Sequence, residues 1–325
     1  MMKILQVMAR DRAEVTDVPT PQPREGEVLM RVEAVTTCPQ WDLHLRHDEP
    51  MFVGHRFTYP YTPGQPGHEA AGTIVGVGEG VTKLNEGDRV CAWRDAGHDR
   101  WGCYAQYVVH RAENVIRAPQ DVPFASLAPL ELAMCVGTVF RMLKNADALA
   151  GRRIGIFGLG PAGLVACQMA QAEGATEVIG FDPIAERREL ATTVGATTCH
   201  DPARLPTDRF PRRPEPPALA TSVDCVGARA SVQTAMDLTA HDVALFGVQR
   251  EDYTYAPRHA GLHLWGYTGH FRESAEYALK LITAGSLDLA PLVTHELPLE
   301  RYAEAIDLLE RRQAIKVCFL SLIHI

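Results

Sequence analysis

The spacing of apolar and polar residues divides the chain into two kinds of region. Before about residue 130, short runs rich in Val, Ile and Tyr, separated by Gly and Pro, include EVLMRVEAV (27–35), AAGTIVGVG (70–78) and YAQYVVH (104–110). Such runs predict the strands of a small, irregular β domain. From about Leu130, strand-like runs alternate with helical segments, as in RIGIFG, GLVACQMAQAEG and EVIGFD. This alternation predicts a parallel sheet of crossover units.

The last part of the chain predicts two amphipathic helices, near 272–284 and 299–311, and a final strand in AIKVCFL. Segment 206–218 holds five prolines in thirteen residues, which predicts a surface loop. The closing SLIHI fits no periodic pattern and is interpreted as a frayed or non-native tail. The predicted fold class is α/β, with a doubly wound parallel sheet domain and a mostly β domain.

Composition narrows the possible partners. The chain has 325 residues, 46% of them hydrophobic, and a net charge of −8, which disfavours a nucleic-acid or anionic membrane surface. No apolar run approaches the length of a membrane helix, and a signal peptide is not expected. Eight cysteines spread singly do not resemble a disulfide framework. We therefore expect a cytoplasmic protein that acts on small molecules.

The segment IFGLGPAG carries a glycine pattern typical of dinucleotide binding. Gly158, Gly160 and Gly163 form G-x-G-x-x-G directly after an apolar strand, with Pro161 and Ala162 opening the helix. The first glycine allows the tight turn, the second lets the backbone approach a pyrophosphate, and the third lets helix pack on strand. The helix N-terminus adds N–H groups that favour the phosphates.

An acidic residue completes this pattern. EVIGFD ends a second strand in Asp182, nineteen residues after Gly163. A carboxylate there accepts hydrogen bonds from ribose hydroxyls and repels a 2′-phosphate, which favours NAD over NADP. Arg187 and Arg188 follow closely and leave NADP as the alternative.

Two short segments offer metal ligands. TTCPQWDLHL holds Cys38, Asp42 and His44, and GQPGHEAAG holds His68 beside Glu69. Alone, a cysteine is more often a buried apolar group, and a histidine in a turn is more often a hydrogen-bonded structural residue. Together with a dinucleotide-binding pattern, these residues carry more weight as candidate metal ligands.

Over essentially its whole length the chain resembles the medium-chain, zinc-dependent alcohol and polyol dehydrogenases. The matching segments, in order, are EGEVLMRVEA, TTC followed by DLH, PGHEAAGTIVGVGEGV, GDRV, YAQYVV, IFGLGPAGL, VDCVG, LITAGSLDLAPLVTHELPLERYAEAIDLL and AIKV. The resemblance implies a discontinuous GroES-like catalytic domain, residues 1–136 and 268–325, and a Rossmann NAD-binding domain, residues 137–267. It also implies a homodimer or homotetramer.

The resemblance implies one catalytic zinc with three protein ligands and an open position. Cys38 and His68 are the first two ligands, and Glu69 either lies behind the metal or binds it. PLELAMCVGTVF offers Cys135 or Glu131 as the third, of which Cys135 is preferred because thiolate suits zinc and its spacing from Gly158 is closer. Lys316, in AIKV, matches a basic residue near the cofactor pyrophosphate, with a solvated lysine as the alternative.

Two departures from the family pattern stand out. The region after GDRV has only Cys91 and Cys103 where many relatives have four cysteines, so no structural zinc is expected. Relatives also carry a hydroxyl residue two positions after the cysteine, where this chain has Gln40. The Gln40 amide does not titrate near neutrality, so His44 is the expected proton carrier.

The expected function is hydride transfer between NAD(H) and a secondary alcohol, polyol or sugar-derived hydroxyl or ketone, through alkoxide formation at zinc. One alternative is a zinc-free reductase of an activated double bond in the same superfamily. Another is a catalytically silent NAD-binding regulatory protein.

Overall fold

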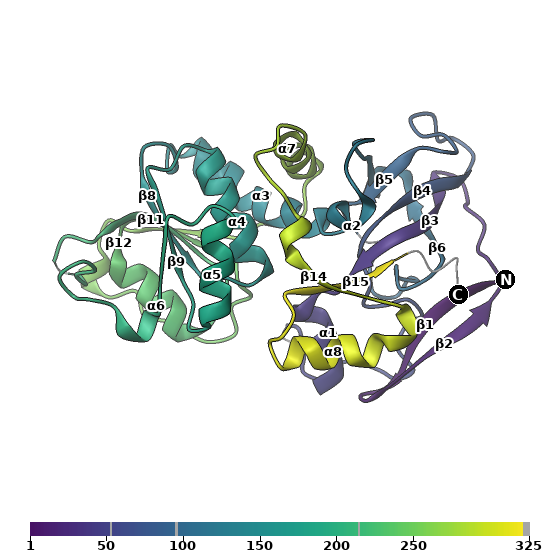
Figure 1. Ribbon diagram of the computed structural model, residues 1–325, viewed down its shortest axis with the longest axis horizontal. Helices are drawn as coiled ribbons and strands as arrows, with labels where there is room; N and C mark the ends of the chain where they lie inside the picture. Colours follow the sequence, from purple (N-terminus) through teal and green to yellow (C-terminus); the bar gives the residue numbers. More distant parts are fainter. Residues whose placement is uncertain (53, 95–96, 214, 321–325) are drawn as a thin grey trace. The chain divides into compact units, whose positions relative to one another are not determined.

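The computed structural model describes residues 1–52, 54–94, 97–213 and 215–320, which pack as two units (Figure 1). Unit 1 joins Met1–Leu132 to the segment that begins at Leu289, and unit 2 is Ala133–Asp288. The domain boundaries at 136/137 and 267/268 stay a prediction, since these units are defined by packing alone. The SLIHI tail lies outside the described residues.

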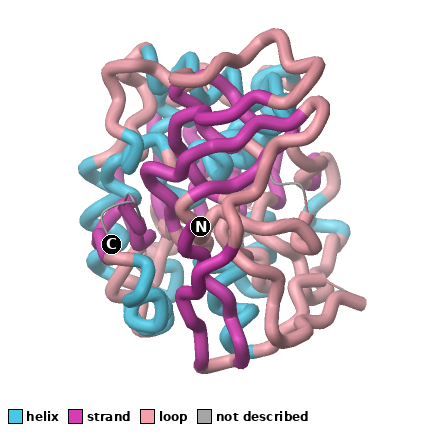
Figure 2. The backbone as a smooth tube through the Cα atoms, turned by 90° about the vertical axis from the view of Figure 1, so that its right-hand side faces the viewer, coloured by secondary structure: helices cyan, strands magenta, loops and turns pink. Residues whose placement is uncertain are grey.

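Unit 1 contains a seven-stranded sheet in the order β14-β15-β3-β4-β5-β7, with β6 paired to β3. The antiparallel pair β1 and β2 lies beside the N-terminus (Figure 2). The strands are β1 (Met2–Ala9), β2 (Arg12–Val18), β3 (Glu27–Thr36), β4 (Glu69–Val77), β5 (Arg89–Ala92), β6 (Tyr107–Arg111), β7 (Val115–Arg117), β14 (Val293–Leu297) and β15 (Lys316–Leu320). The helices are α1 (Pro39–His47), α2 (Phe124–Leu127) and α8 (Tyr302–Glu310). The final strand pairs with β3, which closes the discontinuous unit.

Unit 2 is built on a six-stranded parallel sheet in the order β10-β9-β8-β11-β12-β13. Renumbered along the chain this is 3-2-1-4-5-6, the doubly wound order of dinucleotide-binding folds, so the predicted fold class is confirmed. The strands are β8 (Arg153–Phe157), β9 (Glu177–Phe181), β10 (Thr198–His200), β11 (Leu219–Asp224), β12 (Thr239–Leu245) and β13 (His263–Gly266). The helices are α4 (Pro161–Ala172), α5 (Ala185–Thr193), α6 (Arg229–Leu238) and α7 (Arg272–Thr283).

The long helix α3 (Leu130–Asn145) runs from the end of unit 1 into unit 2. Within the described part of the chain, the stretch Phe124–Asn145 is long and apolar enough to span a membrane by length and composition alone. Charged residues such as Glu131 and Arg141 interrupt this stretch, but a mean hydropathy taken over eighteen positions stays high despite them. Of its most apolar window, 78% is buried inside the protein, which is typical of a core helix.

The proline-rich segment 206–218 forms neither helix nor strand among its described residues, as predicted. This segment is nevertheless held against the rest of unit 2 by two of its side chains, those of Phe210 and Arg213. Phe210 is 3% exposed and packs edge-on against Phe181 at 5.6 Å, within an apolar cluster on the sheet. The guanidinium of Arg213 donates to the carbonyls of Thr239 and Ala240 at 2.9 and 2.6 Å. Side chains therefore hold a segment in which proline has removed helical hydrogen bonds.

Candidate active site

The stretch that follows Cys38 forms a helix. Helix α1 begins at Pro39, directly after Cys38 at the N-cap. Proline suits the first helical position because it has no N–H to lose and its φ is already helical. Gln40 and His44 are therefore four residues apart on one helix, which places them on the same face.

A buried carboxylate fixes the start of this helix. Asp42 is fully buried and accepts hydrogen bonds from the Cys38 backbone N–H at 2.8 Å, from Tyr104 Oη at 2.9 Å and from Tyr302 Oη at 2.8 Å. Burial raises the pKa of Asp42 to about 6, against the opposing effect of these three donors. Because one donor is the Cys38 amide, Asp42 sets the position from which the Cys38 thiol projects.

His68 is oriented as a metal-binding imidazole requires. Its Nδ1 lies 2.7 Å from the Pro66 carbonyl, to which it donates, so the neutral form of the ring would present the lone pair of Nε2 to a metal. Burial lowers the pKa of His68, but Cys38, Glu131 and Glu69 outweigh this and raise it well above the ordinary value. Cys38, His68 and Glu69 each offer a ligand atom, and these atoms all lie within 4.8 Å of one another. Thiolate, imidazole and carboxylate are the donors that zinc prefers, so the group fits a zinc ion.

Glu69 is paired with the residue predicted to face the cofactor. Lys316 Nζ donates to Glu69 Oε1 at 2.6 Å and to the Thr37 carbonyl at 2.8 Å, and Thr36 donates to Glu69 Oε2 at 3.0 Å. Lys316 and Glu69 are each 1% exposed. An ammonium buried and paired in this way is not presented to a pyrophosphate, so the structure supports neither the predicted cofactor role of Lys316 nor a solvated lysine.

The two candidates for the third ligand, Glu131 and Cys135, are one turn apart on α3. Glu131 Oε2 lies 3.8 Å from His68 Nε2, and both side chains are buried in unit 1. Cys135 belongs to unit 2, where its Sγ lies 3.2 Å from Tyr267 Oη and 3.5 Å from His270 Nε2. The structure therefore brings Glu131 to His68, one of the first two predicted ligands, whereas sequence reasoning preferred Cys135. The preference for Cys135 came partly from its spacing along the chain before Gly158. That spacing does not say which side chain of α3 lies near His68.

Two further side chains of α1, those of His44 and Trp41, have separate partners. His44 Nδ1 lies 3.1 Å from the Glu49 carbonyl and 3.8 Å from the Glu49 carboxylate, which is 63% exposed. Trp41 stacks on His98 at 3.7 Å, and the ring of His98 lies 6.4 Å from that of His68. An aromatic pair therefore lies next to a predicted metal ligand, and His98 was not expected there.

Cys91 and Cys103, the two cysteines on β5 and beyond it, are both buried. Cys91 is buried on β5, where burial raises the pKa of its thiol to about 12. Cys103 is buried with its Sγ 3.6 Å from His110 Nε2. These two thiols behave as core residues in the part of the chain that the structure describes.

The glycine-rich turn of unit 2 follows β8 as the sequence predicts. Gly158 has φ +84°, and a Cβ on Gly163 would lie 1.9 Å from the Gly158 carbonyl oxygen, so strand and helix approach too closely for a side chain. Gly160 is the N-cap of α4 and Pro161 is its first residue. A Cβ on Gly160 would meet nothing nearer than Arg187 Nη1 at 3.8 Å. This turn therefore keeps open space beside the helix N-terminus, as a phosphate would need.

Asp182 lies at the end of β9 and braces the same turn. Its carboxylate accepts the backbone N–H groups of Leu159 and Ile184, both at 2.8 Å, and lies 3.9 Å from Arg187 Nη1. Arg188 is turned away and donates to the Asp182 carbonyl at 2.7 Å. The predicted cofactor residues of unit 2, including Ala162 on the first turn of α4, thus lie around one strand-to-helix turn.

Comparisons with known proteins agree with this geometry. Residues 24–120 match the alcohol dehydrogenase GroES-like domain, and residues 161–281 match the zinc-binding dehydrogenase family. L-threonine 3-dehydrogenase of Thermococcus kodakarensis is 30% identical, over 98% of this chain and 97% of the relative. Human sorbitol dehydrogenase (Homo sapiens) is 27% identical, over 92% of this chain and 90% of the relative. An alcohol dehydrogenase from E. coli CFT073, crystallised with NADH, has a TM-score of 0.85 at 20% identity, over 98% of this chain and 99% of that chain, and shows the same fold.

Proposed function

Because the chain belongs to the family of medium-chain zinc-binding dehydrogenases, we propose that it transfers a hydride between NAD(H) and a secondary alcohol, a polyol or a sugar-derived hydroxyl. The curated relatives are dehydrogenases, which supports the general reaction. The observation that carries the proposal is the convergence of Cys38, His68 and Glu69 within 4.8 Å of one another.

In this proposal Cys38, His68 and Glu131 hold one zinc ion, and Glu69 lies behind it or replaces one ligand. Bound zinc would act as a Lewis acid that makes an alcohol hydroxyl easier to deprotonate. The chain itself holds the proposed ligands in position before a metal binds. Asp42 holds the Cys38 backbone, Pro66 selects the His68 tautomer, and Lys316 holds Glu69.

The proton released from the alcohol needs a way out, and α1 is the proposed route. Gln40 can hold an alcohol or water O–H through its amide, and His44 lies one turn further along the same face. His44 in turn lies beside Glu49, whose carboxylate is exposed. We propose that His44 passes the proton towards this surface carboxylate. In this role Gln40 replaces the hydroxyl residue that the family resemblance implies.

The cofactor is proposed to be NAD. Asp182 places a negative charge at the end of β9, which disfavours a 2′-phosphate there. Gly160 leaves room for a pyrophosphate at the N-terminus of α4, with the Arg187 guanidinium beside it. Arg187 balances the local charge without removing the carboxylate, so NAD remains preferred over NADP.

The range of substrates follows from the relatives. Those named for L-threonine and for sorbitol act on compounds that each carry a secondary hydroxyl on a short polar chain. A secondary alcohol with neighbouring polar groups is therefore the proposed substrate. A homodimer or homotetramer in the cytoplasm completes the proposal, on the family resemblance alone.

Metal content and activity measured on the same samples test this function. We expect about one zinc per chain, and NAD reduction by at least one member of a panel of secondary alcohols, polyols and L-threonine, assayed with NAD and NADP in parallel. Cys38→Ala should remove both zinc and activity, whereas Cys91→Ala, a buried thiol in the same unit, should keep both. A zinc-free protein, or full turnover by Cys38→Ala, would exclude the zinc mechanism, and a preference for NADP would overturn the role of Asp182.

A further inference from the structure

A second candidate binding site lies in unit 2, at the end of the sheet opposite the glycine-rich turn. Thr221 on β11 pairs with both Ile154, near the start of β8, and Asp242 on β12. The glycine turn begins at Gly158, four residues after Ile154, which at about 3.3 Å per residue is roughly 13 Å further along the sheet. A ligand at Asp242 would therefore be separate from the proposed dinucleotide site.

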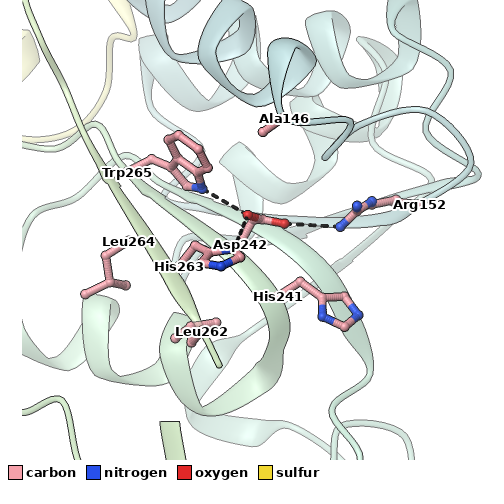
Figure 3. Close-up of a pocket in the computed structure, with 8 residues that line it drawn as sticks. All are labelled: Ala146, Arg152, His241, Asp242, Leu262, His263, Leu264 and Trp265. Atoms are coloured by element: carbon pink, nitrogen blue, oxygen red, sulfur yellow. Dashed lines mark hydrogen bonds and ion pairs between the residues drawn. The ribbon is translucent and has the colours of Figure 1, made fainter. Parts of the chain in front are cut away.

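A hollow of about 750 Å³ opens here, within the usual size range of small-molecule sites. It is lined by residues from the loop before β8, from β12 and β13, and from the end of α3 (Figure 3). The lining residues are Ala146, Arg152, His241, Asp242, Leu262, His263, Leu264 and Trp265.

A buried carboxylate organises the polar side of this hollow. Asp242 is 4% exposed, and its two oxygens accept from Arg152 Nη1 at 3.1 Å, Trp265 Nε1 at 2.9 Å and His263 Nδ1 at 3.2 Å. Figure 3 shows these three side chains converging on Asp242 from different sides. Their orientation is therefore set before any ligand arrives, which lowers the entropic cost of binding.

The chemistry of the lining points to an anion. Asp242 is the single carboxylate among the described residues that line the hollow, and donors already occupy both of its oxygens. A guanidinium carries five N–H groups in a planar fork, and Arg152 uses Nη1 for Asp242. The imidazoles of His241 and His263 add ring nitrogens that can form hydrogen bonds. Leu264 and the Trp265 ring supply apolar surface beside them.

We propose that this hollow binds a small organic anion, with its negative group against Arg152 and its apolar part against Trp265 and Leu264. A planar carboxylate suits a guanidinium because two parallel hydrogen bonds can form. A flat apolar body suits the indole face, since an aromatic ring adds stacking to the area that it buries. The proposal does not depend on hydride transfer, so a negative result for this site would leave the proposed function unaffected, and the reverse also holds.

Calorimetric titration of the full-length protein with benzoate, and separately with inorganic phosphate, tests the site. We expect saturable binding of one benzoate per chain with a Kd below about 1 mM, and weaker binding of phosphate, which lacks the apolar part. Arg152→Gln should weaken benzoate binding at least tenfold. Arg153→Gln is the matched control, because this neighbouring guanidinium pairs with Glu177 instead and should leave the affinity unchanged.

The result could be obscured if Arg152→Gln unfolds the protein, because it removes a partner from a buried carboxylate. His241→Ala avoids this problem, since it changes the lining without touching the bonds of Asp242, and a Kd raised about threefold or more would support the site. The absence of saturable binding, an unchanged Kd in both lining variants, or equal loss in Arg153→Gln would overturn the proposal.

Discussion

The three hydrogen bonds to Asp42 can be tested one at a time, beginning with Tyr302→Phe. This substitution deletes only the hydroxyl that donates to Asp42 at 2.8 Å. The ring can keep its packing against Tyr104 and Phe319, at 5.4 and 6.2 Å between centroids, so no cavity opens. The change therefore isolates one hydrogen bond to a buried carboxylate.

A hydrogen bond to a charged group contributes about 1.5–3 kcal/mol, about twice the value for a neutral pair. At pH 8, above the Asp42 pKa of about 6, the carboxylate is charged, and we expect Tyr302→Phe to lower the free energy of unfolding by about 2 kcal/mol. At pH 5 the carboxyl is mostly protonated, and the loss should shrink to about 1 kcal/mol. Near the unfolding midpoint, the larger value corresponds to a fall of about 4–8 °C in Tm.

Urea unfolding followed by tryptophan fluorescence measures these differences. Tyr255→Phe is the matched control, because Tyr255 is 48% exposed and donates over a long 3.4 Å to the Leu262 carbonyl, so its loss should be below about 0.5 kcal/mol. In the Asp42→Asn background the effect of Tyr302→Phe should fall by at least about 1 kcal/mol. Equal losses at pH 5 and pH 8, or equal losses with and without the Asp42→Asn substitution, would refute the charged hydrogen bond.

Three further predictions address the metal, the cofactor turn and acid stability. Glu131→Gln should lower zinc occupancy at least tenfold in a chelator titration, whereas Cys135→Ala should leave it unchanged; the reverse result would restore Cys135 as the third ligand. Gly160→Ala should raise the Kd for NAD at least tenfold with little loss of stability, whereas Gly163→Ala should destabilise the protein, because its Cβ would lie 1.9 Å from a carbonyl oxygen. The pKa of Asp237 is lowered despite burial, chiefly by the hydrogen bond from His259, so its contribution to stability is present above the ordinary carboxyl pKa of 3.8 and is lost as pH falls through the lower native value. Asp237→Asn should therefore be less stable than the wild type at pH 7, with the difference narrowing below about pH 4, and a constant difference across an acid series would contradict this.

Much of the secondary structure of unit 2 could be predicted from the sequence, because it depends on interactions between residues close together in the chain. Each step of the strand–turn–helix unit around Gly158 to Gly163 depends on neighbours within a few residues: a positive φ, a missing Cβ and a helix N-terminus. Helices α7 and α8 and strand β15 likewise follow from periodicity, and all three predictions are confirmed. The pairing of Cys38 with His68 came from a family resemblance, and in the structure the two lie together.

The sequence by itself therefore determined the elements, the parallel sheet and the residues able to bind a metal or a dinucleotide. The tertiary structure decided which of these residues meet. Tyr302 is 260 positions from Asp42, and Lys316 is 247 positions from Glu69, and no local pattern marks either pair. The sequence favoured Cys135 over Glu131 as the third ligand, whereas in the structure the Glu131 carboxylate lies 3.8 Å from His68. Contacts of this kind depend on how separate elements pack, because a buried polar group must find its partner wherever the fold brings one.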